Sequence, residues 1–488
     1  MPSRLFELSA VDAVEKIKSQ EITAENYINS IVERILRVEE KINAFITLNL
    51  EKAVEKAREI DKKISRGEDV GRLAGVAVAV KDNICTLGIR TTCASRMLEN
   101  FIPPYDATVI ERIKREDAII IGKTNMDEFA MGSTTETSYF GPTRNPWDLN
   151  KVPGGSSGGS AAAIISEETT LTLGSDTGGS VRCPASYCST IGLKPTYGLV
   201  SRYGLIAYAN SLEQIGPLAK STADCALLLS IIGGYDPKDS TSVNVSLTNY
   251  FNAFTDDLRG LKIGLPGEFF GEGVEESVKR HVWSAIHLLE DLGATYEEIS
   301  LPNLEYALAA YYIVAMSEAS SNLARYDGLR YGYRVEHDDA DWAKIYARNR
   351  RIGFGSEVKR RIMLGTYALS AGYYEQYYLK ALKVRTIIRR EFESALKKFD
   401  ALIGPTMPIP PFNIGEKIQD PLALYMCDIL TVPANLTGYP AISIPCGFEG
   451  KLPIGLQAIG KPFNESTLLK ISFALENNTD FVKRRPEL

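Results

Sequence analysis

Short apolar runs, separated by glycine- and proline-rich turns and by helical segments, constrain the fold of this chain most strongly. They recur from about residue 73 onward, and each is short enough to form one strand of a sheet. Strands that alternate with helices favour a mixed or parallel sheet that helices cover on both faces. We therefore predict an α/β fold with strands near residues 75–80, 118–121, 171–173, 261–265, 401–403 and 441–445.

Helical periodicity marks two further stretches of the chain. Within residues 1–65, Thr23 is placed to cap a helix whose apolar side chains recur from Tyr27 to Leu36 with helical period. Residues 270–400 are also mainly helical by pattern and are rich in Arg and Tyr. We predict an N-terminal helical arm, residues 1–65, and a main domain, residues 66–488, in which residues 270–400 form a mainly helical insertion.

The composition argues against several classes of protein. Of the 488 residues, 44% are hydrophobic and 24% charged, which is ordinary for a soluble globular protein and unlike a disordered, collagenous or coiled-coil chain. Lys and Arg number 55 against 61 Asp and Glu, so the net charge is −6. A domain that holds nucleic acid through its phosphates usually has a basic excess. If RNA is involved, we expect another chain to hold most of it.

Neither a membrane segment nor a secretory leader is evident. The apolar runs fall well short of the roughly 20 residues that cross a bilayer as a helix, and residues 1–7 lack a basic cap followed by an apolar core. We therefore expect a cytoplasmic protein that does not contact a membrane. Seven cysteines at irregular spacings, without a Cys-x-x-Cys pair, predict free and mostly buried thiols.

Two nucleotide-binding motifs are incomplete. Residues 122–124, Gly-Lys-Thr, resemble the end of a phosphate-binding loop, but Asp117 stands where that loop needs its first glycine. No G-x-G-x-x-G lies between a strand and a helix, which argues against a dinucleotide. We expect no cofactor and no metal in this chain.

The scarcity of histidine bears on hydrolytic chemistry. The three histidines lack metal-ligand spacing and a neighbouring nucleophile, and we expect surface or partly buried positions for them: His281, His287 and His337. A serine hydrolase built from this chain would then need another base that works near neutral pH. A desolvated lysine is the remaining candidate.

Two segments supply a lysine and a serine in suitable settings. The apolar strand at 75–80 ends in Lys81, and burial there would bring the pKa of its amine toward neutrality. The alternative is a lysine with no catalytic role that reaches from the strand end to water. Residues 154–160, Gly-Gly-Ser-Ser-Gly-Gly-Ser, precede an apolar helix. They suit a tight turn whose amides face an anion or, taken alone, a flexible linker.

A third segment, residues 174–185, carries a second serine. Gly178 and Gly179 precede Ser180 and permit a close approach of the backbone. The consecutive amides from Thr177 to Ser180 are therefore candidates for an oxyanion hole around a carbonyl that Ser180 attacks.

These three segments together resemble the amidase signature family, whose members hydrolyse carboxamides with a Ser, cis-Ser, Lys triad. The resemblance rests on Lys81, Ser156 and Ser180 in their motifs, and it is closer still to the glutamine-hydrolysing subunits of tRNA-dependent amidotransferases. It extends over essentially the whole chain, including residues 122–132, 145–147, 194–198, 317–327, 357–365 and 428–433. It implies the amidase signature fold for residues 66–488, with 270–400 lining the substrate pocket.

The resemblance also assigns roles within the site. It makes Ser180 the nucleophile, Ser156 a bridging serine on a cis peptide after Gly155, and Lys81 the base. One departure from the family pattern is visible, because Cys183 stands where a glutamine is usual. This change places a thiol near the reacting centre.

A clamp for the amino-acid head of glutamine is implied as well. Asp428 would take the α-ammonium and Arg360 the α-carboxylate, with Tyr311 nearby; Arg361 and Tyr312 are alternatives one position away. One fixed charge of each sign suits a zwitterion, and an arginine binds a carboxylate with two parallel hydrogen bonds.

The function implied is that of a glutaminase subunit that supplies ammonia to convert Glu-tRNA(Gln), with Asp-tRNA(Asn) left open, during protein biosynthesis. In that branch of the family a B-type subunit holds ATP, Mg and the acyl-tRNA, and a small C-type subunit completes a heterotrimer. We expect glutamine as the substrate, both of these subunits as partners, and tRNA contact mainly through the B-type partner. The alternatives are a stand-alone amidase for small carboxamides and a non-catalytic scaffold of the same fold.

Overall fold

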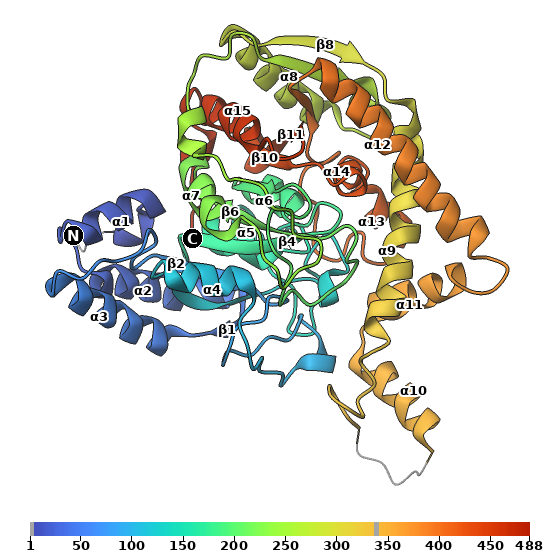
Figure 1. Cartoon of the computed structure of the whole chain (residues 1–488), viewed down its shortest axis with the longest axis horizontal. Coiled ribbons are helices and arrows are strands. Elements are labelled where there is room, and N and C mark those ends of the chain that lie inside the picture. The colour runs from blue at the N-terminus through green and yellow to red at the C-terminus, as the bar shows by residue number, and fades with distance from the viewer. Residues whose placement is uncertain (1–3, 336–340) are drawn as a thin grey trace.

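The computed structural model describes residues 4–335 and 341–488, and one mixed sheet runs through its centre (Figure 1). In the described residues the sheet has eleven strands in the order β1-β3-β2-β4-β6-β5-β10-β11-β9-β7-β8. They are β1 (Phe45–Leu48), β2 (Ala77–Lys81), β3 (Ile119–Thr124), β4 (Leu171–Asp176), β5 (Ile191–Lys194), β6 (Gln214–Ala219), β7 (Lys262–Pro266), β8 (Thr295–Ile299), β9 (Ala401–Pro405), β10 (Ala441–Glu449) and β11 (Leu452–Gly460).

The predicted strands are all present, as β2, β3, β4, β7, β9 and β10. Strand β2 pairs in parallel with β3 and with β4, and every one of its residues is buried. A strand that is covered on both faces needs such a continuous apolar sequence, which explains why the pattern identified it. The predicted mixed α/β architecture is confirmed.

Helices cover both faces of the sheet. A Cβ added at Gly447 of β10 would meet the ring of His281 on one face, whereas one added at Gly455 of β11 would meet Ser186 on the other. The α-helices of the described residues are α1 (Ala10–Lys18), α2 (Ala24–Ile42), α3 (Leu50–Ser65), α4 (Thr108–Arg115), α5 (Gly158–Ile165), α6 (Arg182–Cys188), α7 (Thr222–Ile232), α8 (Glu276–Asp291), α9 (Ala307–Leu323), α10 (Trp342–Gly353), α11 (Ser356–Ala368), α12 (Lys380–Lys398), α13 (Pro421–Met426), α14 (Val432–Thr437) and α15 (Glu465–Asn477).

The N-terminal arm contains α1 to α3, and the predicted cap of α2 is present, since the Thr23 side chain accepts from the Asn26 amide. The expectation that residues 1–65 are all helical is wrong at one place. Strand β1 lies between α2 and α3 and pairs antiparallel with β3, so the arm contributes an edge strand to the central sheet. Its short sequence, Phe-Ile-Thr-Leu, also fits a helical pattern, and pairing with β3 decides its conformation.

Residues 270–400 include α9 to α12, which lie on the side of the molecule away from α1 to α3 (Figure 1). Strand β8 also falls in this range and pairs with β7 at the sheet edge. The division into an arm, a main domain and an insertion therefore stays a prediction.

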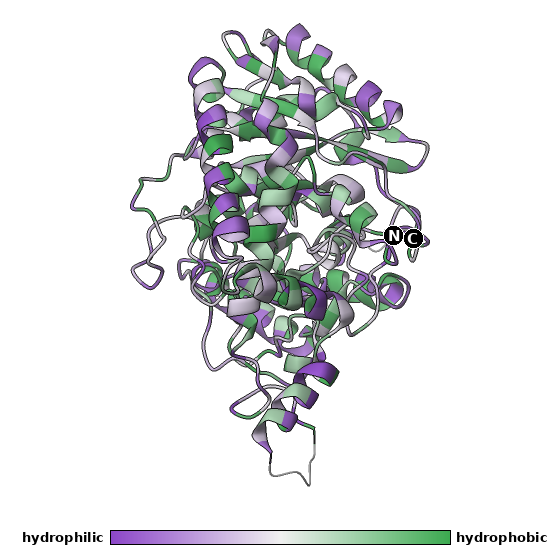
Figure 2. Ribbon diagram, turned by 90° about the vertical axis from the view of Figure 1, so that its right-hand side faces the viewer, coloured by the Kyte–Doolittle hydropathy of each residue, from purple (hydrophilic) through white to green (hydrophobic). Residues whose placement is uncertain are grey.

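Figure 2, seen from the side, again places α10 at one end of the molecule and shows outer helices with both hydrophilic and hydrophobic faces. Each helix in the described part of the chain is too short or too polar to cross a bilayer.

Candidate active site

Lys81 is the last residue of β2, and its side chain is fully buried. The Nζ atom lies 2.8 Å from Ser156 Oγ and 3.1 Å from the carbonyl oxygen of Ser175. Burial lowers the pKa of Lys81 to about 7, while the negative charges of Asp127 and Asp176 act in the opposite direction. The lysine therefore does not reach water, and its neutral form is accessible near neutral pH.

Ser156 lies in the turn that precedes α5 and is fully buried. The peptide bond between Gly155 and Ser156 is cis, as the resemblance implies. The turn is also held from outside, since Thr135 Oγ1 donates to the Gly154 carbonyl at 2.9 Å and the Asp127 amide donates to the Ser156 carbonyl at 3.3 Å. A flexible linker is therefore excluded for this segment.

Ser180 lies in the turn between β4 and α6, and 8% of its surface is exposed. The Ser157 amide donates to the Ser180 carbonyl at 3.1 Å, so the two serine-bearing turns are directly hydrogen-bonded. The sheet places Lys81 against Ser156, and this backbone hydrogen bond joins the turn of Ser156 to the turn of Ser180.

A buried ion pair fixes the turn that carries Ser180. Asp176 Oδ2 accepts from Arg182 Nε and Asp176 Oδ1 from Arg182 Nη2, each at 3.0 Å. Although burial opposes the charge, the Arg182 guanidinium and the Asn435 amide hold the pKa of Asp176 well below its usual range. The carboxylate also accepts from the Val181 amide, which ties the first turn of α6 to the end of β4.

The expected oxyanion hole differs from the structure at one position. The Gly179 amide donates to Asp176 Oδ1 at 2.8 Å and is therefore turned away from an incoming carbonyl oxygen. Within the described ranges, no acceptor meets the amides of Thr177, Gly178 or Ser180. Those three amides remain available as donors, whereas Gly179 serves the conformation of the turn, with a φ of 130°.

Asp428 lies beside this turn and is 7% exposed. Its carboxylate accepts from Ser133 Oγ at 2.8 Å and from the Tyr312 hydroxyl at 2.6 Å, and burial raises its pKa to about 6. The Tyr311 hydroxyl lies close to the same turn, since a Cβ on Gly178 would lie 2.3 Å from the Tyr311 hydroxyl oxygen. Tyr312 therefore holds Asp428, and Tyr311 lies against the turn of Ser180.

The two candidate arginines lie on α11 in different surroundings. Arg361 is 3% exposed, and it donates to Glu357 Oε1 at 2.7 Å and to the Tyr208 hydroxyl at 2.8 Å. Its guanidinium also lies 5.3 Å from the centroid of the Tyr312 ring. Arg360 is 40% exposed and pairs with the other Glu357 oxygen. Arg361 is thus held within the protein, where its charge lowers the pKa of Asp428, while the Arg360 side chain is partly exposed to solvent.

Cys183 lies within the site, as its sequence position suggested. The Cys183 thiol donates to the Ser133 carbonyl at 3.7 Å, and a Cβ on Gly154 would lie 3.0 Å from its sulfur. Burial raises the pKa of Cys183 well above its usual value, so it is a neutral thiol and fills space beside the Ser156 turn. The seven cysteines are all free and buried.

Several polar residues of the site were missed by sequence reasoning. Asp127 is fully buried and accepts from the amides of Thr134 and Thr135, and a Cβ on Gly155 would lie 2.1 Å from its Oδ2. Thr431 Oγ1 donates to the Gly178 carbonyl at 2.5 Å. Asp127 belongs to the stretch 122–132 and Thr431 to the stretch 428–433 on which the resemblance rests, and this is the one signal for either residue.

Neither of the two histidines that the structure describes takes part in this site. His281 is 22% exposed beside Glu449, and His287 is 57% exposed, while His337 lies outside the described residues. In residues 4–335 and 341–488, no cluster of three or more His, Cys, Asp or Glu side chains is arranged to hold a metal ion.

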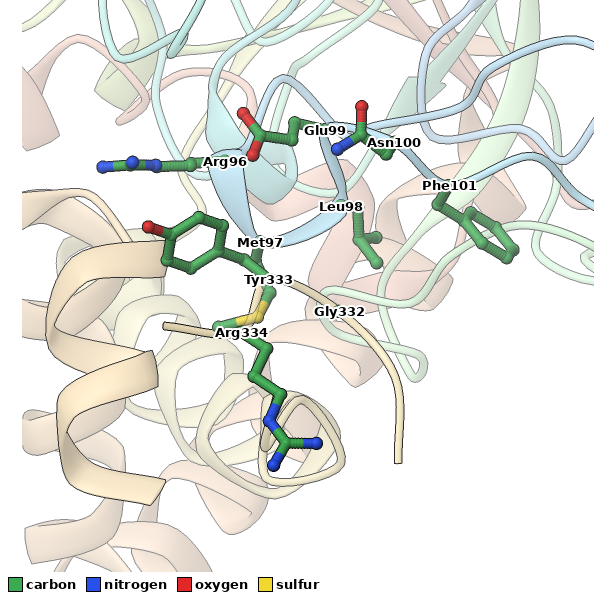
Figure 3. A pocket seen from close by; sticks show the side chains of 9 residues that line it. All are labelled: Arg96, Met97, Leu98, Glu99, Asn100, Phe101, Gly332, Tyr333 and Arg334. Carbon is green, nitrogen blue, oxygen red and sulfur yellow. The ribbon is translucent and has the colours of Figure 1, made fainter. Parts of the chain in front are cut away.

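A cavity of about 410 Å³ opens elsewhere, between the short helix at Arg96–Leu98 and residues 332–334 (Figure 3). The lysine, the two serines and Asp428 do not line it. Its wall includes Met97 and Tyr333, which join the core to the helical segment.

The sheet, the cis turn and the buried lysine and serines define a class of protein, and the Amidase family model matches residues 26–469. This chain belongs to the amidase family.

Individual relatives are more specific. The chain is 57% identical over 484 residues to the A-type subunit of the glutamyl-tRNA(Gln) amidotransferase of Carboxydothermus hydrogenoformans, covering 99% of this chain and 100% of that protein. It is similar to the crystal structure of the corresponding glutamyl-tRNA(Gln) amidotransferase chain of Thermotoga maritima, with 44% identity, a TM-score of 0.81, and 97% and 95% of the two chains covered. A bacterial aryl acylamidase is 26% identical with a TM-score of 0.86 over 98% and 99% of the chains.

Proposed function

We propose that this chain is the glutamine-hydrolysing subunit of a tRNA-dependent amidotransferase. The observation that carries the chemistry is the 2.8 Å contact between Lys81 Nζ and Ser156 Oγ, on a turn hydrogen-bonded to that of Ser180. The relatives named as the A-type chain of glutamyl-tRNA(Gln) amidotransferase, at 57% identity over nearly the whole chain, support glutamine as the amide.

In the proposed mechanism the neutral Lys81 amine accepts a proton from Ser156, which accepts one from Ser180. The Ser180 oxygen attacks the side-chain amide carbon of glutamine, and the amides of Thr177, Gly178 and Ser180 stabilise the oxyanion. Ser156 then protonates the departing nitrogen, and ammonia leaves. Water then attacks the glutamyl ester and gives its proton through Ser156 to Lys81, and a proton returns through Ser156 to the Ser180 oxygen as glutamate leaves.

We propose that Asp428 binds the α-ammonium of glutamine and Arg360 its α-carboxylate, with Tyr311 against the reacting amide. Asp428 is a buried carboxylate that two hydroxyls orient, which suits a cation that loses its water on binding. Arg360 supports the second contact because its side chain is 40% exposed, whereas Arg361 is engaged by Glu357 and Tyr208. Arg361 is then a structural neighbour that orients Glu357.

We place this chain in a cytoplasmic heterotrimer that serves protein biosynthesis. The B-type subunit would hold ATP, Mg and the acyl-tRNA and consume the ammonia, and the small C-type subunit would pack on this chain. The net charge of −6 supports this division, because a chain that gripped tRNA by itself would need a basic surface.

A stand-alone amidase is the second candidate, supported by the 26% identical aryl acylamidase. The carboxylate at Asp428 and the partly exposed Arg360 favour an amino-acid substrate over a small neutral or aryl amide. A non-catalytic scaffold is disfavoured by the lysine with a pKa near 7 beside a buried serine.

The proposal is tested with Ser180→Ala in the assembled heterotrimer. We expect loss of glutamine-dependent amidation and retention of amidation with added ammonium, because the nucleophile acts only on glutamine. A variant that keeps glutamine-dependent activity would contradict the proposed role of Ser180. Loss of both activities would assign Ser180 a structural role, and a wild-type chain that hydrolyses simple amides but not glutamine would favour the stand-alone amidase.

A further inference from the structure

Glu128 is a buried carboxylate that the proposed mechanism does not use. It is 3% exposed, and its Oε1 accepts from Ser95 Oγ at 2.5 Å while its Oε2 accepts from the Gly355 amide at 2.8 Å. The three residues come from segments more than 30 positions apart in sequence. One carboxylate therefore joins three separate parts of the chain.

The Gly355 end of this contact is the N-terminus of α11. Gly355 is the N-cap residue of that helix and has no side chain with which to cap it, so the Glu128 carboxylate supplies the acceptor from another segment. The approach is close, since a Cβ on Gly355 would lie 2.3 Å from Glu128 Oε2. A negative charge at this end is also favourable for the dipole of a 13-residue helix.

Helix α11 carries the arginine assigned to the substrate carboxylate. Arg360 lies about 7.5 Å along the helix axis from Gly355, at about 1.5 Å per residue. Glu357, in the first turn, pairs with both Arg360 and Arg361 and accepts from the Tyr425 hydroxyl at 2.7 Å. A shift of the helix start would therefore move the guanidinium of Arg360 directly.

At the other end of the contact, the segment that carries Ser95 is bound to two neighbouring segments. Ser95 Oγ is also 3.3 Å from the Gly353 carbonyl, and the Tyr333 amide donates to the Met97 carbonyl at 2.7 Å. The Met97 side chain packs under Gly353, where a Cβ would lie 2.7 Å from its methyl carbon. Figure 3 shows Met97, in the short helix at 96–98, next to Tyr333 and Gly332. Glu128 thus completes the attachment of α11 to the core.

We propose that Glu128 is a positioning residue that fixes the N-terminus of α11 and, through Arg360, the site for the α-carboxylate of glutamine. The inference rests on the proposed function. It also connects the stretch 122–132, whose Asp127 lies against the turn of Ser156, to the opposite wall of the site. The adjacent carboxylates of Asp127 and Glu128 would then fix the turn of Ser156 and the N-terminus of α11 relative to each other.

The test is Glu128→Gln in the full chain assembled with its partner chains, assayed at pH 8. That pH lies above the pKa of Glu128, which burial raises to about 7. The side-chain amide that Glu128→Gln introduces has one acceptor oxygen, whereas the carboxylate has two. Either the Ser95 hydroxyl or the Gly355 amide therefore loses its acceptor. We expect KM for glutamine to rise about 10-fold with kcat within about threefold of wild type. The reason is that the variant displaces only the Arg360 guanidinium, which binds the α-carboxylate of the substrate. Hydrogen exchange at the amides of residues 355–359 should become faster.

Two further variants separate positioning from general loss of stability. Ser95→Ala removes one donor, keeps Glu128, and should move KM in the same direction by less. Glu39→Gln is the matched control, because the two carboxylate oxygens of Glu39 accept separately from the amides of Phe45 at 2.7 Å and Ala44 at 2.9 Å, and no hydrogen bond or ion pair in the described residues joins Glu39 to α11. It should lower the melting temperature without changing KM.

Unchanged exchange at α11 in Glu128→Gln would overturn the inference, and so would faster exchange with an unchanged KM. A rise in KM for Glu39→Gln equal to that for Glu128→Gln would overturn it as well, because the effect would then reflect stability alone. If the wild-type complex hydrolyses no glutamine, the proposed function fails instead, and exchange at residues 355–359 still decides whether Glu128 holds the helix.

Discussion

At the scale of single residues, the chemistry of this site depends on how burial changes two ionisable groups. Lys81 is a base only when neutral, and full burial at the end of β2 brings its pKa to about 7. Asp428 binds a cation only when charged, and burial raises its pKa to about 6. Both groups are therefore in their working forms above pH 7, although the same physical cause moves their pKa values in opposite directions.

We predict that kcat for glutamine hydrolysis falls as the pH drops below about 7, by close to tenfold per pH unit at the acid end, and is flat above pH 8. Protonation of Lys81 removes the acceptor for the Ser156 proton, which explains the direction. A pH series of kcat from 5.5 to 9 measures this. Lys81→Met should lower kcat by roughly 10²- to 10⁴-fold, and a flat profile for the wild type would contradict a neutral lysine base.

A second pH effect is expected in KM rather than kcat. As the pH falls through about 6, Asp428 becomes protonated and loses its attraction for the α-ammonium, so KM for glutamine should rise. Asp428→Asn should raise KM at pH 8 by roughly 10- to 100-fold, the value of a hydrogen bond to a charged group. KM of the variant should not change further between pH 7 and 5.5. A variant with the KM of the wild type would remove Asp428 from the binding site.

Site residues that stand beside a strand end or a glycine-rich turn were predictable from the sequence. Site residues that come from distant segments were not. Lys81, Ser156 and Ser180 each stand beside a strand end or glycines that indicate their setting. Ser133 and Thr431 contact the site only because distant segments fold against each other, at Asp428 and Gly178 respectively. The Gly179 amide was expected in the oxyanion hole, but Asp176 competes for it, and the spacing alone contains no information on that competition.

At the scale of elements, strands were predictable where burial is continuous. Strands β6 and β11 contain Pro217 and Pro453, residues that argue locally against a central strand. Strand β8 is mostly polar and lies at the sheet edge, where one-sided exposure removes the apolar signal. Pairing with neighbouring strands determines these three elements, and the partners are not visible from local sequence.

The turn between β4 and α6 leads to a prediction for Gly178. A Cβ there would lie 2.3 Å from the hydroxyl oxygen of the buried Tyr311, so Gly178→Ala has to displace either the ring or the turn. Because the amides of this turn are the proposed oxyanion donors, we expect kcat to fall by roughly 10²- to 10³-fold. The control is Gly267→Ala, where the nearest atom would be 3.8 Å away and kcat should not change. Equal activities of the two variants would argue against a role for the turn in catalysis.

At the scale of the whole molecule, the N-terminal arm shares the central sheet with the rest of the chain. Strand β1 pairs with β3, Arg34 Nε donates to the Ser166 carbonyl at 2.8 Å, and Tyr27 is hydrogen-bonded to Thr170. The sequence pattern identified the apolar face of α2 but not the strand that follows it. These contacts imply that the arm unfolds together with the sheet.

We predict that Ile31→Ala, in the buried face of α2, destabilises the whole chain by about 2–5 kcal/mol, the usual cost of a cavity left by a large apolar side chain. Thermal unfolding should show one transition at a lower temperature, because the arm and the core share a sheet. Leu36→Ala, on the same helix but 74% exposed, is the control and should leave the transition in place. A separate early transition in Ile31→Ala would show instead that the arm is an independent unit. Glutaminase kcat measured below the transition should equal that of the wild type, since α2 carries no residue of the site.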